Sequence, residues 1–147
     1  ALLIVMLQVI LIQFAMEFVF RINTGVSHIL LFTILMMFGA AAVGLGLLIT
    51  AFSGSSYMAG TLSPLIMTPT CMLGGCYWSV DMMPEFMQKI SYFVPQRWVM
   101  DAIEKLQTGG TQGDIILNMA ILAAFAAAFI LTAIYRFSKT GSLQKFV

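Results

Sequence analysis

The sequence predicts an all-α membrane protein, a polytopic bundle of helices, and three observations support this fold class. From Ile22 to Val80 the chain contains no Asp, Glu, Lys or Arg. Of its 147 residues, 61% are hydrophobic and 9% charged, and the mean hydropathy is +0.99. Four separate stretches are apolar over the length of a membrane helix. Soluble domains carry charge along nearly every surface stretch, whereas a charge at the bilayer centre costs roughly 2.5–3.5 kcal/mol.

Each predicted span has the ~20 mostly apolar residues that a membrane helix requires. Within one transmembrane domain, residues 1–147, we place the spans at about 1–20, 29–52, 57–78 and 115–135. Polar turn segments follow the first two spans, and Arg136 and Lys139 follow the last. The third span contains Pro64 and Pro69 and ends near two glycines, so we expect it to be kinked or unwound in its second half.

A re-entrant hairpin of two short amphipathic helices is predicted between the third and fourth spans, at about residues 84–107. Apolar residues recur there at helical spacing, with charged residues on the other faces. Pro84 and Pro95 suit the first turn of each helix. Neither helix is long enough to cross a bilayer, so the pair lies in the interface or dips into the membrane.

Small residues on the fourth span predict a helix-packing surface. Ala120, Ala124, Ala128 and Thr132 recur every four residues. Helices in lipid associate through close packing of small residues rather than through the hydrophobic effect. We therefore expect this ribbon to face protein.

Polar residues within the first span are candidates for lining a transport pathway. Gln8, Gln13 and Glu17 lie among apolar residues, where polar groups normally face a partner or a cavity. The alternative is hydrogen bonding between helices, with Glu17 paired to Arg21 one turn away.

Charges in the predicted hairpin allow two interpretations. Arg97, Asp101 and Lys105 recur every four residues and would form a salt-bridged helix face. Alternatively Pro84, Pro95, Arg97, Trp98 and Asp101 would form part of a gate that seals a pathway.

The sequence contains no recognisable catalytic, cofactor or metal site. His28 is the only histidine, and Cys71 and Cys76, five residues apart, are expected to be free thiols. No glycine-rich phosphate loop or basic patch points to nucleotide or nucleic acid binding. The chain is therefore not expected to be an enzyme.

A family resemblance rests on three motifs. The third span ends in residues 73–79 (LGGCYWS), a Met-Pro step opens the segment 83–90 (MPEFMQKI), and a Pro-x-x-aromatic step opens 95–98 (PQRW). This order resembles the C-terminal half of the membrane subunit of type-2 ABC exporters, the ABC-2 permease family. Gly74 stands where the family usually has a small serine, and Ser79 stands where proline is common.

The resemblance implies an orientation, partners and a location. The spans would be helices three to six of a six-helix subunit in a cell membrane, as a multi-pass protein of the bacterial plasma membrane. The first two helices would lie upstream, the hairpin near the extracellular face and the tail in the cytoplasm. A separate ABC ATP-binding subunit would hold ATP and Mg, and a second permease copy or paralogue would complete the pathway, surrounded by membrane lipids.

The substrate class and one alternative function remain as hypotheses. Twelve Met and twelve Phe residues suggest an apolar pathway for a lipid-like, drug or antibiotic substrate, although lipid contact explains most of them. An ion-coupled secondary transporter or channel is the alternative function, and Glu17 is the only acidic residue inside a predicted span.

Overall fold

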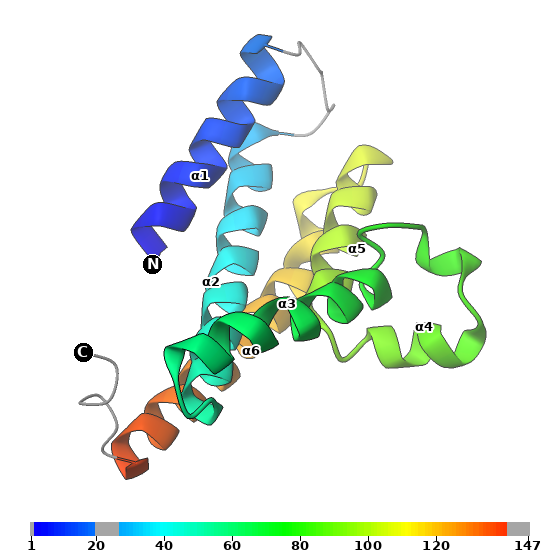
Figure 1. Cartoon of the computed structure of the whole chain (residues 1–147). Helices are drawn as coiled ribbons and strands as arrows, with labels where there is room; N and C mark the ends of the chain where they lie inside the picture. The colour runs from blue at the N-terminus through cyan, green and yellow to red at the C-terminus, as the bar shows by residue number, and fades with distance from the viewer. Residues whose placement is uncertain (1, 20–26, 141–147) are drawn as a thin grey trace.

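The structure is a computed structural model that describes residues 2–19 and 27–140, and every regular element in these ranges is helical. Figure 1 shows the chain from α1 at its beginning to α6 at its end. The elements are α1 (Leu2–Phe14), η1 (Ala15–Val19), α2 (His28–Phe52), α3 (Ser56–Leu73), η2 (Val80–Met82), α4 (Glu85–Ser91), α5 (Pro95–Gln107) and α6 (Gln112–Thr140). The all-α prediction is confirmed.

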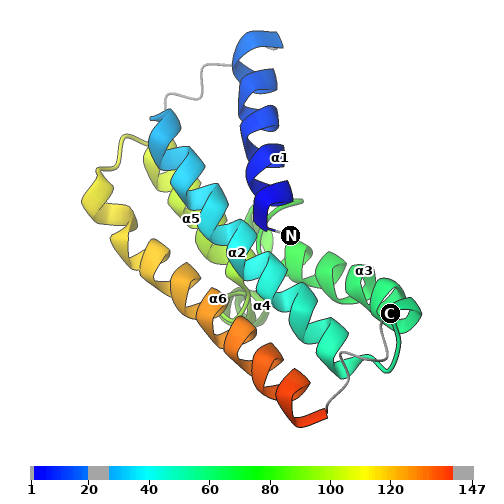
Figure 2. The same cartoon turned by 90° about the vertical axis from the view of Figure 1, so that its left-hand side faces the viewer.

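Helices α2 and α6 form the centre of the fold and lie side by side in both views (Figures 1 and 2). Both are long and apolar enough to cross a bilayer. At Gly44 the two helices approach so closely that an added Cβ would lie 3.0 Å from the Cβ of Phe129 and 3.1 Å from Ile130. Glycine at this position therefore permits the close contact between α2 and α6.

Helix α1 packs against α2 and continues into the π-helical turn η1, so the first predicted span is helical over residues 2–19. An added Cβ at Gly39 of α2 would lie 2.5 Å from the side chain of Val5, which marks the contact between the helices. Ser27 precedes α2, and His28 is its first residue, one position before the predicted start of the second span.

Helix α3 is shorter than predicted, because it ends at Leu73 instead of continuing to Trp78. The helix is continuous through Pro64 and Pro69 and unwinds at the glycines that follow. Gly75 adopts φ +87°, a left-handed conformation that ends the helix and turns the chain. The expected unwinding is therefore present, but it begins after the prolines.

Two short helices, α4 and α5, lie where the hairpin was predicted. Pro84 is the residue before α4, and Pro95 is the first residue of α5, as their fixed φ angles favour. Helix α4 contacts α3, whereas α5 packs along α6 (Figure 1). The apolar face of α5 meets α2 and α6 in a core that contains Ile34, Val99, Ala102, Leu106, Ile115 and Leu122.

The alanine ribbon of α6 does not pack against the described helices of this chain, so its expected contact with protein stays a prediction. Ala120, Ala124, Ala128 and Thr132 are all exposed. The face that contacts α2 and α5 carries a different set of residues, namely Ile115, Asn118, Leu122, Ala126 and Ala133. At Gly44 of α2 the large side chains of Phe129 and Ile130 lie close, so at this contact the small residue is on α2.

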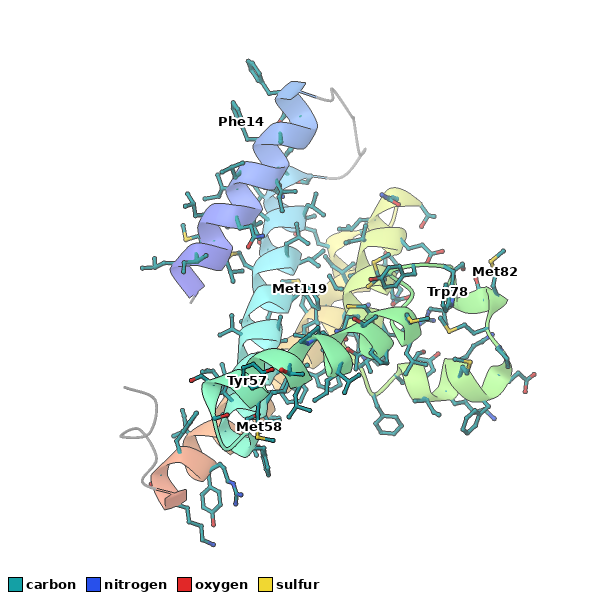
Figure 3. All side chains as sticks on the ribbon, viewed as in Figure 1. Phe14, Tyr57, Met58, Trp78, Met82 and Met119 are labelled. Carbon is teal, nitrogen blue, oxygen red and sulfur yellow. The ribbon has the colours of Figure 1, made fainter. Side chains whose placement is uncertain are left out.

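Large apolar side chains cover much of the outer surface. Leu3 and Tyr57, for example, are 81% and 85% exposed. Phe14, Tyr57 and Met58 point away from the helices in Figure 3, whereas Met119 lies inside the bundle. A surface of this kind suits lipid or protein neighbours better than water.

Candidate functional site

A buried asparagine joins the hairpin to the last helix. Asn118 of α6 has no exposed surface, and its Nδ2 donates hydrogen bonds to the carboxylate of Asp101 at 2.7 Å and the carbonyl of Trp98 at 2.9 Å. Its Oδ1 accepts a hydrogen bond from Lys105 Nζ at 3.2 Å. Both heteroatoms of the amide are therefore paired, as burial requires.

Asp101 and Lys105 complete this polar cluster on α5. Their side chains, one helical turn apart, form an ion pair with 2.7 Å between Nζ and Oδ2. Burial opposes ionisation of Asp101, but the hydrogen bonds from Asn118 and Lys105 and the charges of Lys105 and Arg97 outweigh it and hold its pKa below the ordinary value. Asp101 is therefore charged at neutral pH and holds α5 against α6.

The beginning of α5 is held by aromatic contacts. Trp98 Nε1 donates a hydrogen bond to the carbonyl of Tyr92 at 3.0 Å, and the two ring centroids are 5.7 Å apart. The guanidinium of Arg97 lies over the Tyr92 ring, 5.6 Å from its centroid. These contacts fix the turn between α4 and α5.

The end of α3 meets the beginning of α5 at a very close contact. An added Cβ at Gly74 would lie 2.3 Å from the Cβ of Gln96, so only glycine fits. Gln96 is 2% exposed, and its Nε2 donates to Thr70 Oγ1 at 3.2 Å, while its Oε1 has no hydrogen-bond partner among the described residues. This junction fixes the position of the hairpin relative to α3.

A cavity of about 730 Å³ lies between the segment of residues 75–81 and the polar face of α5. Tyr77 and Trp78 line it from the segment, and Asp101 and Glu104 line it from the helix. Among the described residues no group of three or more His, Cys, Asp or Glu side chains is placed to hold a metal ion. The cavity can therefore offer aromatic and charged contacts to an organic ligand.

The polar residues of the first span lie apart from this region, since α1 is on the far side of α2 from the hairpin (Figure 1). Gln8 is exposed, and Gln13 is half-buried, with no hydrogen-bond partner for its Nε2 in the described part of the chain. Glu17 approaches His28 to 3.4 Å, which links η1 to the start of α2. The alternative partner, Arg21, lies outside the described residues.

Comparison with known protein families identifies the chain. A model for the ABC-2 type transporter family matches residues 1–108, a range that includes α1, α2, α3 and both hairpin helices. The chain belongs to the ABC-2 type transporter family. This confirms the resemblance inferred from the motifs, and it makes the chain part of a membrane transport protein.

Individual relatives of this ABC-2 chain come from bacteria. It is 34% identical over 112 residues to the linearmycin resistance permease protein LnrN of Bacillus subtilis, a match that covers 76% of this chain and 29% of that protein. It is 26% identical over 127 residues to the probable multidrug ABC transporter permease YbhS of Escherichia coli, which covers 85% and 34%. The chain spans about a third of the length of these relatives. No solved structure matches it significantly.

In this ABC-2 chain, three of the predicted hairpin residues lie together. Arg97, Trp98 and Asp101 of α5 line one small cavity, and the predicted Asp101–Lys105 pair is present. Pro84 lies directly before α4, and Pro95 is the first residue of α5.

Sequence reasoning missed Asn118, Gln96 and the packing role of Gly74. Asn118 carries a signal that could have found it, because it is a polar amide between Leu117 and Met119 inside an apolar span. The close contact at Gly74 depends on how α3 and α5 meet, so no local sequence pattern reveals it.

Proposed function

We propose that the chain is the C-terminal part of the permease subunit of an ATP-driven exporter. The observation that carries this proposal is the ABC-2 family match, which includes the predicted hairpin as well as the first three helices. A separate ABC ATP-binding subunit binds ATP and Mg and hydrolyses the nucleotide. This chain contributes the pathway and performs no chemistry itself.

The proposed topology has four spans, α1, α2, α3 and α6, in a bacterial plasma membrane. The start of α2, the end of α5 and the start of α6 share the outer side, and the ends of α2 and α6 share the cytoplasmic side. The arrangement of α2 beside α6 supports the assignment of these two helices as spans, since both have the length and apolarity of a span. Helices α4 and α5 form a re-entrant pair near the outer face.

The pathway forms between this subunit and a second copy or a paralogue. Rigid-body movement of the helix bundles, driven by ATP on the partner, opens it alternately to the two sides. Exposed apolar side chains and the small residues of α6 supply surfaces for a helical partner. Within the hairpin, the residues around Arg97, Trp98 and Asp101 gate the outer end, with Gln8, Gln13 and Glu17 lining another part.

The proposed substrate is lipid-like, a drug or an antibiotic. Two relatives carry names that refer to linearmycin resistance and to multidrug transport, and these names support an amphipathic or apolar substrate for this chain.

The test uses the full-length parent protein, purified in mild detergent from its native host. Co-purification of a stoichiometric ATP-binding subunit, with ATP hydrolysis by the complex, is expected. Absence of such a subunit, under conditions that preserve a known exporter complex, would favour the ion-coupled transporter. Replacement of Glu17 by Ala separates the two functions further, because ion-coupled transport should be lost without that carboxylate, whereas an ATP-driven exporter should tolerate the change better.

A further inference from the structure

The cavity beside α5 has the size of a site for a small organic molecule. Its volume of about 730 Å³ falls within the range of about 300–1,000 Å³ typical of ligand pockets. One wall is the polar face of α5, because the opposite face of this helix is buried against α2 and α6. The other wall is the chain segment of residues 75–81.

This second wall is held in place by its two ends. Gly75 turns the chain with φ +87°, next to the contact of Gly74 with α5. Val80, only 5% exposed, packs so closely that an added Cβ at Gly75 would lie 2.7 Å from its Cγ2. Between these anchors Tyr77 and Trp78 line the cavity, and Figure 3 shows Trp78 on the stretch between α3 and α4.

The charges that line the cavity favour a cation. Three carboxylates, those of Asp81, Asp101 and Glu104, face two basic groups, those of Arg97 and Lys105. Lys105 and Asp101 neutralise each other at 2.7 Å, and Arg97 lies over the ring of Tyr92. Within the described part of the chain neither remaining carboxylate makes an ion pair. The net charge of the lining is therefore negative.

The aromatic wall favours a cation with an apolar body. The rings of Tyr77 and Trp78 are 6.4 Å apart between centroids and tilted by 46°, and their side chains are 66% and 40% exposed. Aromatic faces attract organic cations through the ring quadrupole and also cover apolar groups. Carboxylates near paired aromatic rings are thus suited to an ammonium or phosphonium group.

We propose that the cavity between residues 75–81 and α5 binds amphipathic organic cations, with Tyr77 and Trp78 covering the apolar body and Asp81 and Glu104 attracting the charge. Its assignment as a substrate site near the outer face, which makes the proposed substrate class more specific, rests on the proposed export function. Binding itself does not depend on that function.

The test measures binding of tetraphenylphosphonium to the full-length parent protein in a neutral detergent, by equilibrium dialysis against protein-free micelles. Tetraphenylborate, which has the same shape and the opposite charge, is the control ligand. Saturable binding of the cation, with weaker or no saturable binding of the anion, is expected. Equal or tighter binding of the anion would overturn the proposal.

Variants connect the binding to this cavity. Asp81→Asn and Glu104→Gln should each weaken cation binding about threefold, and together about tenfold, as expected for exposed charge pairs. Trp78→Leu should weaken it about two- to fivefold through loss of a cation–π contact. Glu85→Gln, an exposed carboxylate of α4 outside the cavity lining, is the matched control. Unchanged affinity in the first three variants, or an equal loss in the control, would contradict the site.

Two further results separate the possible ligands and the two proposals. Displacement of the probe by phosphatidylethanolamine, but not by phosphatidylglycerol, would support the site with a lipid amine as its ligand, whereas no displacement supports a soluble cation. An ATP-hydrolysing complex that fails to bind the probe would disprove this inference alone. Binding by a protein without an ATP-binding partner would contradict only the export function.

Discussion

Replacement of Asn118 by Leu tests whether the buried amide holds the hairpin helix α5 against α6. The change removes the hydrogen bonds that Asn118 donates to the Asp101 carboxylate and the Trp98 carbonyl, and the weaker one that it accepts from Lys105. A hydrogen bond to a charged group contributes roughly 1.5–3 kcal/mol and a neutral one about 1 kcal/mol. The Asp101 side chain is 27% exposed, so in the variant water can hydrate its carboxylate and offset part of the loss of the charged hydrogen bond. We expect the free energy of unfolding to fall by about 2 kcal/mol.

The assay is unfolding of the full-length parent protein by sodium dodecyl sulfate, followed by circular dichroism. Thr132→Val is the matched control, because the Thr132 hydroxyl is exposed and donates only to the carbonyl of Ala128 in its own helix. A double-mutant cycle with Asp101→Asn should give a coupling of about 1 kcal/mol between Asp101 and Asn118. A loss below about 0.5 kcal/mol, or equal to that of the control, would refute the reasoning.

Three further predictions concern the same packing. The Asp101 pKa is lower in the folded state than its ordinary value of 3.8, so its stabilisation is present above that pH and is lost as the pH falls through the lower folded-state value. Acid unfolding between pH 6 and 2 should therefore be less steep in Asp101→Asn, and an unchanged slope would contradict this. Gly74→Ala places a Cβ 2.3 Å from the Gln96 Cβ of α5 and should lower the free energy of unfolding by about 1–3 kcal/mol in the same assay. The control Gly60→Ala, with open space around it, should be neutral or stabilising. Gly44→Leu should force α2 away from α6 and lower the free energy of unfolding by about 1–3 kcal/mol. Gly46→Leu, where nothing lies within 4 Å, should leave it unchanged, and equal effects of the two variants would disprove the close contact.

The sequence alone was sufficient for the all-α membrane class and for the family. A charge-free run of this length excludes a soluble domain, since hydration of a surface requires charge. The positions of Pro84 and Pro95 located the starts of both hairpin helices, because proline constrains its own backbone wherever it occurs. The Asp101–Lys105 pair was also predictable, since residues four apart share a helix face.

The tertiary structure decided which faces of these helices meet. The ribbon at Ala120 and Ala124 has the spacing of a packing surface, yet the neighbouring face with Asn118 and Leu122 packs against α2 and α5. Spacing shows that residues share a face, but it carries no information on which partner lies opposite. In the sequence, Asn118 is therefore an isolated polar residue. Only the approach of α5 gives it Asp101 and Trp98 as partners, because those contacts join residues about 20 positions apart.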